Sequence, residues 1–177
     1  RPPRSTQGVS SAASDVYKRQ HPPTLFLGFA VSIIPFAYAI SALRLKDYKQ
    51  WLMPAKKWLI LSIVILGVGI MMGAYWAYET LNFGGYWNWD PVENAVYVPW
   101  LFLVAALHSV IITQKNNEYH KMTLILTVTS FVLILYSTFL TRSGILGDSS
   151  VHSFTDLGLS CLLYTSDAAD DTPCVDL

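Results

Sequence analysis

The histidines are the residues of this chain best suited to binding a metal, and there are four of them. His21 stands directly before the first long apolar segment, in the run His-Pro-Pro, and His152 follows the fourth, in Ser-Val-His-Ser-Phe. Imidazole nitrogen is a common axial ligand of haem iron. A single histidine at the end of an apolar segment is more often a polar surface residue, so this pair needs a second feature before it indicates a ligand.

The second feature is the aromatic loop 83–94, which reads Phe-Gly-Gly-Tyr-Trp-Asn-Trp-Asp-Pro-Val-Glu-Asn. Its glycines and main aromatic residues are Gly84, Gly85, Tyr86, Trp87 and Trp89. Aromatic faces stack on flat rings, and paired glycines let backbone approach closely. The alternative is an aromatic belt at a membrane interface, but a belt needs no fixed spacing and no glycine pair. We therefore predict an aromatic platform for a flat ligand, flanked by His21 and His152 as ligands of its iron.

Asp90 and Pro91 stand at the predicted start of a helix. Aspartate is a favoured N-cap residue, and proline is favoured at the first helical position. Asp90 therefore has two open roles, one in capping this helix and one in contacting the bound ligand.

His108 and His120 receive different interpretations. His108 lies about fourteen residues into the third apolar segment, or ~21 Å at 1.5 Å per residue. An ionisable group inside a membrane helix is expensive and marks a functional site. We interpret His108 as a ligand of haem iron, the alternative being a neutral histidine hydrogen-bonded to a neighbouring helix. His120 stands beside Lys121 in a polar segment, and we interpret it as a solvated surface residue.

The fold class follows from the distribution of charge. Only 14% of the residues are charged and 53% are hydrophobic, whereas soluble domains contain about 25% charged residues. Four segments of about twenty residues carry no charge, which is the length that crosses a membrane as a helix. They are about 24–43, 58–78, 94–113 and 122–141. We predict an all-α integral membrane protein with four transmembrane helices, because a soluble bundle would need helices with a polar face.

The connecting segments predict the orientation in the membrane. Those after the first and third helices contain seven basic residues: Arg44, Lys46, Lys49, Lys56, Lys57, Lys115 and Lys121. The segment between the second and third helices is acidic, with Glu79, Asp90 and Glu93. Lysine and arginine gather on the cytoplasmic side. The aromatic loop, His21 and His152 are therefore expected on the outer, periplasmic side of a bacterial inner membrane.

Two hexapeptides near the ends are related through DNA. Residues 15–20, Asp-Val-Tyr-Lys-Arg-Gln, can be coded by GAT GTG TAT AAG AGA CAG, whose reverse complement in a shifted frame encodes Cys-Leu-Leu-Tyr-Thr-Ser, residues 161–166. One DNA adaptor joined to both ends of a fragment produces this relationship. We predict that residues 1–20 and about 161–177 are adaptor-derived and disordered, and that 21–160 is a fragment of a membrane-embedded haem-handling domain. Both cysteines fall in 161–177, so 21–160 contains no thiol.

Several ordered motifs together resemble a known family. They are His21-Pro-Pro, Gly85-Tyr-Trp-Asn-Trp-Asp-Pro-Val-Glu-Asn-Ala95, Pro99-Trp100-Leu101, His108-Ser109, Thr138-Phe-Leu-Thr-Arg-Ser-Gly144 and Ser150-Val-His152. With these motifs the chain resembles the CcmF family of haem-lyase subunits in cytochrome c maturation, within the haem-handling proteins that bear a Trp-rich "WWD" signature. One departure is Tyr86-Trp87, where many relatives have two tryptophans; an aromatic face is preserved.

The resemblance implies roles for three histidines. His21 and His152 would hold incoming haem at the WWD loop, and His108 would be one of two intramembrane histidines that ligate a permanent b-type haem. The second such histidine lies further along the family's chain. We assign no catalytic residue here, because proximity between haem and its partner can supply much of the rate.

The resemblance also implies an activity and partners. The activity is that of a haem lyase, which attaches haem covalently to apocytochrome c through the thiols of a Cys-x-x-Cys-His motif. The partners are a haem chaperone, apocytochrome c, other maturation subunits, quinol as electron donor and membrane lipid, with no nucleic acid. Two alternatives stay open: a haem transporter or exporter of the WWD group without ligation activity, and a quinone-linked respiratory membrane subunit.

Overall fold

Four long α-helices make up the computed structural model, which describes residues 7–80, 85–143 and 145–146. The helices are α1 (Gln7–Leu45), α2 (Leu52–Thr80), α3 (Pro91–Asn116) and α4 (His120–Arg142). Each contains a span of 23 to 27 residues that is long and apolar enough to cross a membrane. The predicted all-α membrane fold with four spanning helices is therefore confirmed.

The helices extend beyond the uncharged segments that predict them, because a hydropathy pattern reports only the part of a helix suited to the hydrocarbon core. α3 begins at Pro91, three positions before the predicted segment. α1 begins at Gln7 and passes through Pro22 and Pro23. The backbone of 7–20 is thus helical where we expected disorder. Residues 161–177 lie outside the described ranges.

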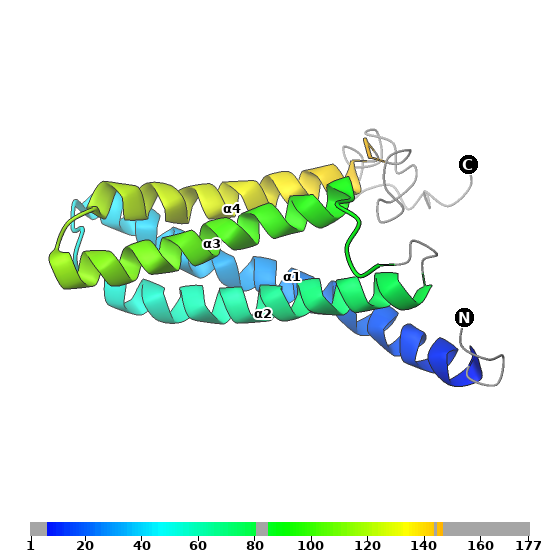
Figure 1. Ribbon diagram of the computed structural model, residues 1–177. Coiled ribbons are helices and arrows are strands. Elements are labelled where there is room, and N and C mark those ends of the chain that lie inside the picture. Colours follow the sequence, from blue (N-terminus) through cyan, green and yellow to red (C-terminus); the bar gives the residue numbers. More distant parts are fainter. Residues whose placement is uncertain (1–6, 81–84, 144, 147–177) are drawn as a thin grey trace, which may run out of the picture.

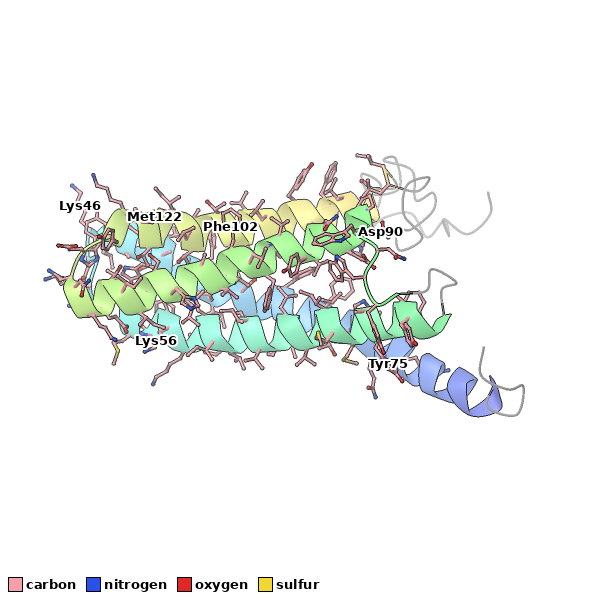
Figure 2. The ribbon with its side chains drawn as sticks, in the orientation of Figure 1. Lys46, Lys56, Tyr75, Asp90, Phe102 and Met122 are labelled. Carbon is pink, nitrogen blue, oxygen red and sulfur yellow. The ribbon has the colours of Figure 1, made fainter. Side chains whose placement is uncertain are left out.

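The four helices form an antiparallel bundle in which α1 packs on α2, α2 on α3, α3 on α4, and α4 on α1. Figure 1 shows the α1–α2 and α3–α4 connections at one end of the bundle, and the α2–α3 connection at the other. Lys46 and Lys56 lie toward the first end, and Tyr75 and Asp90 toward the second (Figure 2). The basic connections and the aromatic loop therefore occupy opposite ends.

The interior of the bundle combines branched apolar residues with hydroxyl groups. Leu59, Leu66, Leu103, Val110 and Ile134 form its apolar centre. Between α3 and α4, the hydroxyl oxygen of Thr123 lies 2.7 Å from that of Ser109 and 2.8 Å from that of Thr113. Such hydroxyl contacts hold membrane helices together, since lipid gives apolar side chains little reason to associate.

Candidate functional site

The end of the aromatic loop is held by a helix cap. The Asp90 side chain accepts a hydrogen bond from the backbone N–H of Val92, and Asp90 and Glu93 complete a reciprocal capping box. Pro91 occupies the first helical turn, where its missing N–H leaves no intrahelical bond unmade. The predicted N-cap at Asp90 and helix start at Pro91 are confirmed.

Two further side chains of α3 hold the middle of the loop. One carboxylate oxygen of Glu93 accepts the backbone N–H groups of Asn88 at 3.0 Å and Asp90 at 3.2 Å. The Asn94 amide donates to the Trp89 carbonyl at 2.9 Å, which supports the left-handed conformation of Trp89 (φ 56°). A non-glycine residue with this φ is uncommon and needs such support. The loop backbone from Asn88 to Asp90 is therefore hydrogen-bonded to side chains at the start of α3.

The indoles of this loop do not form one flat surface. Trp87 and Trp89 meet edge to face, with centroids 6.1 Å apart and planes at 87°, an arrangement that aromatic quadrupoles favour. Tyr97 lies 5.4 Å from Trp87 and 6.4 Å from Trp89, also edge to face. Trp89 remains 67% exposed. The single platform that the sequence suggests is instead an angled aromatic cluster, with Trp89 as its exposed member.

The tyrosine of the loop, Tyr86, packs against α2. Tyr86 stacks on Tyr78 near the end of α2, with ring centroids 4.1 Å apart and planes at 11°. Tyr86 still leaves 53% of its surface exposed. Gly85 has open space beside it, since an added Cβ would meet only Trp87 backbone atoms at 3.9 and 4.0 Å. Among the described residues, neither position is therefore closely covered.

His21 lies in the seam between α1 and α2, at the loop end of the bundle. Its Nδ1 is 2.8 Å from the Gly69 carbonyl oxygen. A carbonyl cannot donate, so Nδ1 carries the proton and the lone pair is on Nε2, the tautomer that binds a metal through Nε2. The ring lies against Gly73, which is about 31 Å along α2 from Leu52 at 1.5 Å per residue.

His108 occupies a different place, on an exposed face of α3. Its Nδ1 donates to the Val104 carbonyl at 2.8 Å, so this imidazole too has its lone pair on Nε2. Counted from Pro91, it lies about 26 Å along the helix, past its midpoint. His108 shares a helical stripe with Tyr97 and Leu101, at spacings that return to one face. No other described helix covers the His108 side chain.

The structure thus separates the candidate ligands that it describes. His21 is near the aromatic loop, whereas His108 is closer to the basic end of α3. His120 begins α4 at that basic end, with Nε2 3.4 Å from the Asn117 side-chain oxygen. Within the described ranges there is no group of three or more His, Cys, Asp or Glu side chains that could hold a bare metal ion. His152 and Gly84 lie outside the described residues.

The sequence did not predict Tyr97 or Trp100 as residues of the candidate site, although Trp100 belongs to the Pro99-Trp100-Leu101 motif. Trp100 donates from its indole nitrogen to the Ile63 carbonyl at 3.0 Å and stacks against Tyr97. These two rings line an apolar groove of about 680 Å³ between α2 and α3, together with Gly67, Met71 and Tyr75. Their signal was helical spacing, since Tyr97 and Trp100 are three residues apart on α3. That spacing is also typical of ordinary packing residues, so it did not distinguish them.

A metalloporphyrin would need fewer protein ligands than a bare ion. The porphyrin supplies four ligands to its iron, so the protein needs to offer only axial imidazoles. Nδ1 of both His21 and His108 is bonded to a backbone carbonyl, which leaves Nε2 for that purpose in the neutral imidazole. The fold defines a multi-pass membrane protein, in which His21 and His108 lie at two separate levels along the bundle.

Comparison with known proteins assigns the chain to a family. Residues 3–146 match the family model described as "Cytochrome C assembly protein". The chain is 39% identical over 155 residues to the cytochrome c-type biogenesis protein CcmF of Pseudomonas aeruginosa, covering 86% of this chain and 23% of that protein. It is 41% identical over 138 residues to CcmF of Escherichia coli, covering 76% of this chain and 21% of that protein.

A solved structure gives the same result. The structure titled "Cytochrome c Heme Lyase CcmF" matches with a TM-score of 0.65 and 37% identity, over 73% of this chain and 22% of that one. This chain therefore belongs to the cytochrome c assembly protein family and is similar to its CcmF members. It spans somewhat less than a quarter of the length of the curated relatives it matches.

Proposed function

We propose that this chain is the part of a CcmF-type haem lyase that receives haem at the aromatic loop, between His21 and His152, for attachment to apocytochrome c. The observation that supports it most is the position of His21. Its imidazole lies at the loop end of the bundle, with Nδ1 bonded to Gly69 and the lone pair on Nε2. Exposed Trp89 and Tyr86 offer aromatic surface at the same end.

In this proposal the chain acts by positioning. The substrate haem carries two vinyl groups, and each cysteine S–H of apocytochrome c adds across one of them, forming a C–S bond and a C–H bond. The Glu93 carboxylate holds the loop backbone in place at the start of α3. His21 and the indoles then hold the porphyrin so that its vinyl edge meets the thiols. Proximity of this kind can contribute about 7–11 kcal/mol to lowering a barrier.

His108 has a separate role in the same proposal, as an axial ligand of a resident b-type haem. Its uncovered position on α3 supports this role, because an imidazole exposed to lipid would be expensive. A further membrane helix of the longer protein would cover this face and bring the second axial histidine. This haem would pass electrons from quinol to the incoming haem.

The proposed orientation places the basic connections in the cytoplasm and the aromatic loop in the periplasm of a bacterial inner membrane. The lysine residues at the end opposite the loop support it, by the positive-inside rule. The loop then faces its proposed partners, a membrane-anchored haem chaperone and apocytochrome c with its Cys-x-x-Cys-His motif. Other maturation subunits would bind the same longer protein.

Haem staining of covalent cytochromes tests this function. The full-length protein with His21→Ala is expressed in cells that lack their own copy, and His120→Ala serves as the control histidine at the opposite end. We expect His21→Ala to abolish covalent cytochrome c and His120→Ala to leave it intact. Normal cytochrome c with His21→Ala would overturn the role of His21. Normal cytochrome c in cells without any copy would instead favour the transporter or the respiratory subunit.

A further inference from the structure

The seam between α1 and α2 brings His21 against two glycines one helical turn apart. A Cβ added at Gly73 would lie 2.5 Å from His21 Cε1 and 2.9 Å from its Nε2. A Cβ added at Gly69 would lie 2.9 Å from the Leu25 side chain and 3.2 Å from the Leu25 backbone nitrogen. Contacts this short do not persist, so Gly73→Ala requires the His21 ring to shift and Gly69→Ala requires Leu25 to shift.

The two glycines act on the imidazole in different ways. Gly69 provides the carbonyl that accepts the Nδ1 proton at 2.8 Å. Gly73 has no side chain, and the flat side of the imidazole ring occupies the space where one would stand. The ring cannot rotate away from an added methyl group without breaking its bond to Gly69. A side chain at Gly73 therefore displaces Nε2, the atom that carries the lone pair.

Close packing alone is the competing explanation, because small residues four apart commonly let membrane helices approach. A substitution at Gly28 distinguishes close packing of the helices from positioning of His21. It lies in the same seam, where an added Cβ would be 3.0 Å from Leu66 Cα. It is seven positions from His21, or about 10 Å along α1. Enlarging Gly28 therefore disturbs the seam without touching the imidazole.

We propose that Gly69 and Gly73 are positioning residues for His21: the Gly69 carbonyl sets its tautomer, and the missing side chain of Gly73 sets the place of Nε2. This inference rests on the proposed function, in which Nε2 is an axial ligand of incoming haem. Groups that orient a metal-binding histidine typically change affinity or activity by about 10- to 100-fold when altered.

Spectroscopic titration with ferric protoporphyrin IX tests the proposal in the purified full-length protein. His21→Ala first identifies the low-spin signal that depends on His21. We expect Gly73→Ala to weaken the haem affinity measured from that signal by about 10- to 100-fold. Gly28→Ala is expected to keep the wild-type affinity. An unchanged signal in Gly73→Ala, or an equal loss in Gly28→Ala, would overturn the positioning role. If His21→Ala itself changes nothing, the proposed function fails instead.

A second pair of variants keeps the test valid if Gly73→Ala does not fold. Replacement of His21 by glycine removes the ring and hence the clash, and added imidazole can then occupy the vacated space. We expect imidazole to restore the low-spin signal in His21→Gly and to need about tenfold higher concentration when Gly73→Ala is also present. Equal restoration by imidazole in both variants would contradict the role of Gly73.

Discussion

The carboxylate of Glu93, in the first turn of α3, accepts the backbone N–H of Asn88 at 3.0 Å. The same oxygen accepts the N–H of Asp90. One side chain therefore attaches the middle of the aromatic loop to the helix that also carries His108. On the other side, the described loop contacts α2 through the rings of Tyr86 with Tyr78 and Tyr75.

Glu93→Ala is expected to loosen the loop and weaken haem binding there. Two backbone N–H groups lose their acceptor, and hydrogen bonds to charged groups contribute about 1.5–3 kcal/mol each when shielded. Haem titration of the full-length protein measures the effect, with Glu118→Ala at the other end of α3 as control. Wild-type affinity in Glu93→Ala would show that the loop is held by other contacts.

Trp89→Ala is expected to lower haem affinity while leaving stability nearly unchanged. The indole is 67% exposed, so little packing is lost, whereas an aromatic contact contributes about 0.5–1.5 kcal/mol, up to roughly tenfold in Kd. Thermal unfolding and haem titration measure the two quantities separately. Tyr136→Ala, an exposed aromatic residue of α4, is the matched control. A large loss of stability with Trp89→Ala would indicate a structural role instead.

His108→Ala is expected to remove the reducible b-type Soret signal of the purified full-length protein. The expected cause is loss of one axial ligand, since the Val104 carbonyl already orients this imidazole for binding through Nε2. Reduced-minus-oxidised spectra give the measurement, and His120→Ala is the control. Persistence of the signal in His108→Ala would exclude this histidine as a ligand.

Thr123→Val is expected to destabilise the α3–α4 pair. Its hydroxyl contacts both Ser109 and Thr113, so two partners lose a hydrogen bond at once. Contacts of this kind average about 0.6 kcal/mol in a membrane protein, which predicts a loss of about 1 kcal/mol. Thermal unfolding in detergent measures it. Thr138→Val is the control, because that hydroxyl bonds within its own helix, and an equal loss there would contradict the interhelical role.

The sequence by itself determined the features that arise locally. Four uncharged segments of membrane-spanning length predict the four helices, because the hydrocarbon core imposes that length on any helix that crosses it. Asp90-Pro91 predicts the start of α3, because capping depends only on residues within one turn. The cluster of aromatic residues between two helices was also evident, because its members are close together in the sequence. His21 was a candidate because it stands beside the first apolar segment.

Only the tertiary structure decided how those features face one another. The bond between His21 and Gly69 joins residues 48 positions apart, and no local pattern specifies which turn of α2 meets which turn of α1. The perpendicular indoles belong to a loop whose backbone is hydrogen-bonded to Glu93 and Asn94 of α3. The outward position of His108 depends on the rotation of α3, which its packing against α2 and α4 selects. Packing joins side chains distant in sequence, and therefore it decided the geometry of the candidate site.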